Sequence, residues 1–164
     1  MPQEAKPTQH RRPGPQRDPG QFGRAEEARA EGRFLIFIDS SLIIALADED
    51  DQFHDKAVEI LLKLEKDQII SDLVLSESVT GVGSRLGYKG GREVFDNLFH
   101  NPSIKVVFLN KRLAQRSVAT YARYGGRLSF ADAVSVRIMQ DNKVRTIVSF
   151  DSDFDGVEGI SRLH

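Results

Sequence analysis

The chain has 164 residues, 40% of them hydrophobic, and a formal net charge of −1 at pH 7, which fits one domain with a real core and excludes a strongly basic nucleic-acid binder. It has no cysteine, so disulfides and thiolate metal sites are excluded, and metal ligands must come from carboxylates and four histidines. The apolar runs are too short to span a membrane and no signal peptide is recognisable, so we expect a soluble, cytoplasmic protein without a membrane partner.

Residues 1–33 differ in composition from the rest of the chain. They hold five of the six prolines and four glycines, with almost no large apolar side chains. Such a segment buries too little surface to offset its chain entropy. We therefore predict a disordered Pro/Gly/Arg-rich tail at 1–33, followed by one folded domain at 34–164.

The folded part alternates between strand-like and helical patterns. The predicted order is strand 33–39, helix 40–47, helix 51–67, strand 68–71, helix 72–87, helix 91–101, strand 104–109, helix 110–126, helix 129–142, strand 144–150 and a short strand 160–164. This alternation predicts an α/β fold, with three α/β/α layers around a mainly parallel sheet of four to five strands.

Several residues between the predicted elements indicate helix caps and a loop. Asp72 and Ser129 are expected to cap the helices that follow them, and the acids at 48–51 are expected to cap the next helix and face solvent. Glycines 87, 90 and 91 predict a flexible loop between two helices.

Acids also follow the first and fourth predicted strands. Asp39 ends the first strand and Asp151 comes directly after the fourth. Because ligands bind at the carboxyl ends of strands in parallel sheets, we expect these two carboxylates to meet in space.

The run of Asp151, Asp153 and Asp155 admits several chemistries besides a simple turn. A calcium loop needs a glutamate at its twelfth position, where this chain has Arg162, so that interpretation is rejected. A D-x-D phosphatase carries its motif at the start of the domain, whereas only nine residues follow Asp155 here. A magnesium site that cleaves nucleic acid needs acidic partners earlier in the chain, and these are present.

The partners occur in four motifs in a fixed order. They are Asp39 in "FIDSS", Glu77 in "VLSES", Asp132 in "LSFADA", and Asp151 with Asp153 in "VSFDSDF". From about Phe34 to the C-terminus, this arrangement resembles the PIN-domain nucleases. Ser149 stands where the family more usually has threonine, which keeps the hydroxyl, and the tail has no counterpart in the minimal family pattern.

The resemblance implies a carboxylate site for Mg²⁺ or Mn²⁺, ions that prefer oxygen ligands. Asp39, Asp132 and Asp151 are expected to hold the main metal, and Glu77 to share a metal or orient the water. Asp153 is a candidate for a second ion and equally a turn residue, and Asp155 is expected to be structural. Ser41 and Ser149 are expected to support the site. Structural alternatives remain, because Asp39 can cap a helix and Asp132 can complete a capping box.

An RNA substrate requires positive surface near these acids. The candidate RNA-binding residues are Arg85, Lys89, Arg92, Lys111, Arg112 and Arg116. Tyr121 and Tyr124 either stack on unpaired bases or pack against the sheet.

The resemblance thus implies an endoribonuclease that cleaves single-stranded or loop RNA and leaves 3′-hydroxyl and 5′-phosphate ends. Its role would be that of a toxin with a protein antitoxin as partner, or of an RNA-processing nuclease, and a homodimer is compatible with either. The alternatives are a catalytically silent PIN-like RNA-binding or protein-interaction module and, from another enzyme class, the D-x-D phosphatase.

Overall fold

A computed structural model of the chain describes residues 35–64 and 67–164. The tail predicted at 1–33 lies outside the described residues. The described part contains one five-stranded sheet in the order β3-β2-β1-β4-β5, and every strand pairs in parallel with its neighbours. The strands are β1 (Ile36–Ile38), β2 (Gln68–Ser71), β3 (Ile104–Val107), β4 (Thr146–Val148) and β5 (Ser161–Leu163).

The centre of the sheet is apolar on both faces. Strand β1 lies between β2 and β4, with Phe37 in register with Ile69 on one side and Ile147 on the other. All three residues are fully buried. Continuous apolar runs of this kind are typical of parallel strands that helices cover on both sides.

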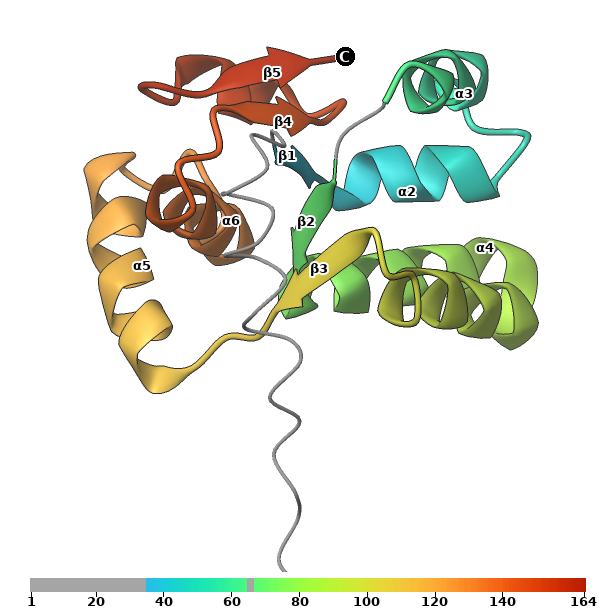
Figure 1. Cartoon of the computed structure of the whole chain (residues 1–164), viewed down its shortest axis with the longest axis horizontal. Helices are drawn as coiled ribbons and strands as arrows, with labels where there is room; N and C mark the ends of the chain where they lie inside the picture. The colour runs from blue at the N-terminus through green and yellow to red at the C-terminus, as the bar shows by residue number, and fades with distance from the viewer. Residues whose placement is uncertain (1–34, 65–66) are drawn as a thin grey trace, which may run out of the picture. The chain divides into compact units, whose positions relative to one another are not determined.

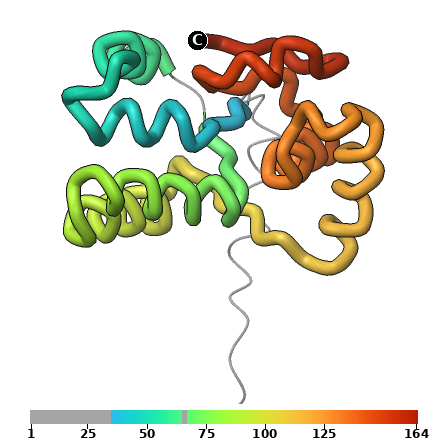
Figure 2. Tube along the Cα trace, turned by 180° about the vertical axis from the view of Figure 1, so that it is seen from behind, coloured from blue at the N-terminus to red at the C-terminus, as the bar shows by residue number. Residues whose placement is uncertain are grey.

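The helices cover both faces of the sheet, as predicted. They are α2 (Ser40–Ala47), α3 (His54–Leu62), α4 (Asp72–Phe99), α5 (Lys111–Arg123) and α6 (Phe130–Asp141), and a 3₁₀ helix, η1 (Ser152–Gly156), precedes β5. Helices α5 and α6 lie on one side, and α2, α3 and α4 on the other (Figure 1); the view from behind shows the same division (Figure 2). The three-layer α/β/α prediction is confirmed. Within the described residues, no helix has the length and apolar character needed to cross a membrane.

The helices predicted at 72–87 and 91–101 are separated by a break, but this break is a sharp kink at Gly87 and not a flexible loop around glycines 87, 90 and 91. The chain runs as α4 from Asp72 to Phe99 and departs from helical geometry only at Gly87, with φ 80° and ψ 171°. Gly90 and Gly91 are helical. Gly91 lies against the first half of α4, where an added Cβ would be 2.7 Å from the Val79 carbonyl oxygen and 3.2 Å from the Cα of Gly83. Gly91 therefore permits close packing of the two halves of α4, and only Gly87 belongs to the break between them.

Two helix starts also differ from expectation. Ser71, not Asp72, caps α4, because its hydroxyl accepts the N–H of Val74 at 3.0 Å. The Asp72 carboxylate accepts the N–H of Leu109 instead, which ties β3 to the start of α4. Helix α3 begins at His54 rather than at residue 51, after turns at 49–53.

Candidate active site

The site is built around Asp39 at the end of β1. Its backbone N–H donates to the carbonyl of Val148, which continues the pairing of β1 with β4. The side chain is buried, and its Oδ2 accepts the hydroxyls of Ser41 at 2.6 Å and Ser149 at 2.8 Å. The same oxygen accepts the Ser41 N–H at 3.3 Å, so Asp39 caps α2 as well. The capping and site interpretations of this residue are thus compatible.

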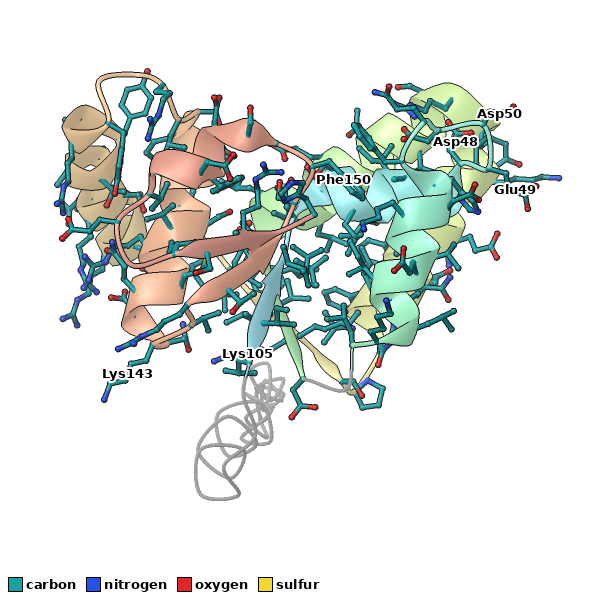
Figure 3. All side chains as sticks on the ribbon, turned by 90° about the horizontal axis from the view of Figure 1, so that it is seen from above. Asp48, Glu49, Asp50, Lys105, Lys143 and Phe150 are labelled. Atoms are coloured by element: carbon teal, nitrogen blue, oxygen red, sulfur yellow. The ribbon has the colours of Figure 1, made fainter. Side chains whose placement is uncertain are left out.

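The two serine hydroxyls join the ends of β1 and β4. Each donates its proton to Asp39 and accepts a backbone N–H from the segment after β4: Phe150 to Ser41 at 2.9 Å, and Asp151 to Ser149 at 3.0 Å. Phe150 lies between the C-terminal segment and α2 (Figure 3). This arrangement requires a hydroxyl at 149, which explains why serine can stand where threonine is more usual.

Glu77 reaches the site from the second turn of α4. Its Oε2 accepts the hydroxyl of Ser40, the first residue of α2, at 3.1 Å. Burial raises the pKa of Glu77 above its usual value, although the Ser40 hydrogen bond opposes the shift. The negative charges of Asp39 and Asp132 raise it further.

Asp132 lies in the first turn of α6 within a complete capping box. The Ser129 hydroxyl accepts the Asp132 N–H at 3.1 Å, and the Asp132 Oδ2 accepts the Ser129 N–H at 2.8 Å. Ser129 is therefore the cap, as predicted. Burial is the main cause that raises the pKa of Asp132, and the charges of Asp39 and Asp151 add to it.

The three aspartates of the terminal run take different positions. The Asp151 Oδ1 accepts the Asp153 N–H at 2.9 Å and so caps η1. Asp153 lines the same cavity as Asp151. Asp155 instead binds the Arg162 guanidinium through both carboxylate oxygens, at 2.6 and 2.7 Å. That pair lowers the pKa of Asp155 and holds η1 against β5.

All the acids proposed for chemistry line one open cavity of about 730 Å³, which Asp155 does not reach. The lining acids are Asp39, Asp51, Glu77, Asp132, Asp151 and Asp153. Four of them share a geometric feature, since each anchors itself through one oxygen and leaves the other without a hydrogen-bond donor among the residues described. These oxygens are Asp39 Oδ1, Glu77 Oε1, Asp132 Oδ1 and Asp151 Oδ2. The same four acids come from the ends of β1 and β4 and the starts of α4 and α6.

The donor chemistry fits a hard divalent cation. Carboxylate oxygens are the ligands that Mg²⁺ and Mn²⁺ prefer, and four are left open on one cavity. Across residues 35–64 and 67–164, no three His, Asp or Glu side chains stand close enough together to hold an ion directly. Mutual repulsion of carboxylates favours such spacing when no cation is bound, and Mg²⁺ commonly keeps several waters between itself and the protein.

Most of the arginines predicted to bind RNA are paired with carboxylates. Arg85 lines the cavity but donates to Asp48 at 3.0 Å and Asp51 at 2.7 Å, acids that were expected to face solvent. Their side chains are only 13% exposed, so these acids hold α4 to the turn after α2.

The basic residues of α5 lie farther from the acids. Arg116 donates two hydrogen bonds to Asp141 at the end of α6. Asp141 is nine residues from Asp132, roughly 13 Å along the helix axis. Arg92 pairs with Asp96 on its own helix. Lys89, Lys111 and Arg112 are exposed and do not line the cavity. Lys105 and Lys143 lie at the edge of the molecule opposite Phe150 (Figure 3).

The structure adds cavity residues that the sequence interpretation did not select as site residues. Phe53 and Phe150 stack with ring centroids 4.5 Å apart and form one wall. Arg127 forms another part of the lining. The sequence placed Arg127 only within a stretch of basic residues; its position five residues before Asp132, after two glycines, was the available signal.

The chain matches known proteins over the same region. Residues 36–160 match the family model of the PIN domain. A solved structure of VapC20 from Mycobacterium tuberculosis, described as a Sarcin-Ricin loop cleaving toxin, is similar with a TM-score of 0.70 and 23% identity, over 76% of this chain and 98% of that one. A chain of a toxin-antitoxin complex from Klebsiella pneumoniae has a TM-score of 0.58 and 19% identity, over 77% and 95%.

A chain of DNA-bound VapBC from Salmonella typhimurium is also similar, with a TM-score of 0.57 and 16% identity, over 79% of this chain and 97% of that one. No curated protein matches the chain. These structural likenesses show a shared fold.

Proposed function

Because this chain belongs to the PIN domain family, we propose that it is a metal-dependent endoribonuclease whose site consists of Asp39, Glu77, Asp132 and Asp151. One observation carries the proposal: each of these carboxylates lines the same cavity, is anchored by one oxygen and leaves the other unpaired within the described residues. A purely structural acid such as Asp155 engages both oxygens.

Asp39, Asp132 and Asp151 would hold Mg²⁺ or Mn²⁺, and Glu77 and Asp153 line the same cavity. The ion supplies positive charge for the transferring phosphate and lowers the pKa of a bound water. Glu77 suits a role in orienting that water, because it lines the same cavity and Ser40 holds one of its oxygens while the other is left without a donor among the described residues. Ser41 and Ser149 fix the orientation of Asp39.

We assign the nuclease role to residues 34–164 and RNA as the substrate. Several solved structures with this fold are toxins or toxin–antitoxin complexes. They support the role of a toxin whose partner is a protein antitoxin.

The experiment is a cleavage assay on purified protein with single-stranded and stem-loop RNA. Cleavage is expected with Mg²⁺ or Mn²⁺, and excess EDTA should abolish it. Asp132→Asn should lose cleavage while still folding, since asparagine can keep the capping interaction with Ser129. Asp155→Asn is the matched control outside the cavity and should still cleave. RNA binding without cleavage by the parent in either metal would favour the catalytically silent module.

A further inference from the structure

Arg127 occupies an unusual position among the arginines near the acid site. It lines the cavity together with Asp132 and Asp151. Arg85 is the other arginine of the lining, and Asp48 and Asp51 neutralise it. Within the described residues, Arg127 has neither an ion pair nor a side-chain hydrogen bond. Its five N–H donors are thus open to an anion in the cavity.

The Arg127 side chain is exposed, and its guanidinium contacts an aromatic ring and not a carboxylate. Its Cζ lies 5.7 Å from the centroid of the Tyr124 ring, in cation–π range. Tyr124 is itself fixed, because its hydroxyl accepts the N–H of Glu158 at 3.3 Å. The sequence left base stacking and packing as alternatives for Tyr124. In the structure its ring contacts the Arg127 guanidinium.

Gly156 provides space that the Arg127 guanidinium occupies. A Cβ built at Gly156 would lie 2.7 Å from the Arg127 Cζ and closer still to its two terminal nitrogens. No side chain of any size fits at Gly156 while Arg127 keeps this position. Gly125 and Gly126, with φ of 61° and 79°, turn the chain between Tyr124 and Arg127 in a conformation that glycine adopts freely.

We propose that Arg127 binds a phosphate of the nucleic-acid backbone in this cavity, which the carboxylates that would hold the metal also line. The positive charge of Arg127, together with that of a bound metal, would offset the negative charge of the acids where the phosphodiester binds. The planar guanidinium suits two phosphate oxygens at once. This inference rests on the proposed function and names the residue that grips the substrate at that site.

Arg123→Ala provides a matched control for Arg127→Ala. Arg123 lies 5.9 Å from the same Tyr124 ring and is exposed, but it pairs with Glu158 and does not line the cavity. Both substitutions remove one positive charge from the segment around the C-terminal end of α5. Only the loss of Arg127 should weaken RNA cleavage, with kcat/KM falling roughly 10- to 100-fold, the range for a hydrogen bond to a charged group.

Binding should report the same contact without cleavage. In an Asp132→Asn background, Arg127→Ala should reduce the slope of log binding constant against log salt by roughly 0.7 for single-stranded RNA, because one counterion fewer is released. Arg127→Lys should keep the slope but recover only part of kcat/KM, since an ammonium lacks the planar fork. Arg123→Ala should leave both the slope and kcat/KM close to the parent values.

Gly156→Ala tests the position of the guanidinium while Arg127 is kept. It should lower kcat/KM, as Arg127→Ala does. The double variant should lose little beyond Arg127→Ala alone, because the two changes remove the same interaction. Equal effects of Arg127→Ala and Arg123→Ala, or additive losses in the double variant, would overturn the proposal. A parent protein that binds but never cleaves RNA would remove the proposed function, while the difference in salt slope would still show whether Arg127 contacts phosphate.

Discussion

At the scale of single residues, the site depends on the hydroxyls of Ser41 and Ser149, which both donate to Asp39. Ser149 is fully buried, donates to Asp39 and accepts the N–H of Asp151. Through these bonds one side chain fixes two of the proposed metal ligands. Stability and metal affinity therefore depend on the same residue.

Ser149→Ala should consequently lower both properties. The Asp151 N–H loses its acceptor and Asp39 loses a donor, so the free energy of unfolding should fall by about 1–3 kcal/mol. Urea unfolding without metal measures this cost, and titration with Mn²⁺ measures the affinity. Ser152→Ala, at an exposed position of η1, is the control and should change neither. An unchanged unfolding midpoint for Ser149→Ala would contradict the role of this hydroxyl.

Glu77 should make the stability of the folded protein depend on pH. Its pKa is raised in the folded protein, chiefly by burial. The folded state then binds more protons than the unfolded state in the interval between the two pKa values, so stability falls as pH rises through that interval. Asp132 contributes with the same sign. Asp51 and Asp155 have lowered pKa values, so the stability that their charged forms contribute is lost only at more acidic pH.

Metal-free protein should therefore become more stable as the pH is lowered from neutral toward the range in which ordinary carboxylates titrate. Glu77→Gln should make this dependence shallower and stabilise the metal-free protein at pH 7, because a half-buried charge that Asp39 and Asp132 repel is removed. Thermal melts of both proteins across this pH range provide the test. A variant with the same pH slope as the parent would show that Glu77 does not titrate as the structure indicates.

At the scale of the elements, α4 shows where local patterns mislead. Three glycines within five residues are typical of a loop, yet only Gly87 leaves the helix. The other two are helical because the second half of α4 packs against the first, with Gly91 beside Val79 and Gly83. That contact joins residues on either side of the break, and no local propensity encodes it.

Gly83 and Gly91 face each other but should respond oppositely to alanine. A Cβ at Gly83 meets nothing nearer than 3.9 Å, so Gly83→Ala should stabilise by up to about 1 kcal/mol through helix propensity. A Cβ at Gly91 would lie 2.7 Å from the Val79 carbonyl oxygen, so Gly91→Ala should destabilise by about 1–3 kcal/mol. Chemical denaturation of the two variants checks the signs. Equal effects would contradict the packing of the two halves of α4.

At the scale of the whole described domain, much of the fold is predictable because its signals are local. Apolar runs ending in acids mark β1 and β4, and the Ser129–Asp132 capping box marks the start of α6. Pairings across long separations are different, because nothing near Arg85 in the sequence indicates Asp48 or Asp51. The same holds for Arg116 with Asp141 and for the place of Arg127 in the cavity.

The acids that line one cavity also predict how the stability of the domain responds to metal. A cation that binds only the folded state raises its stability, by about 2.7 kcal/mol at one hundred times the dissociation constant. Added Mn²⁺ should therefore raise the melting temperature, and Asp151→Asn should reduce that increment because one open carboxylate oxygen is replaced by an amide. Asp155→Asn is the matched control in the same segment. It weakens the pair with Arg162 and should lower the metal-free melting temperature, yet its Mn²⁺ increment should match that of the parent. An increment lost in Asp155→Asn but kept in Asp151→Asn would place the cation outside the cavity at the ends of β1 and β4.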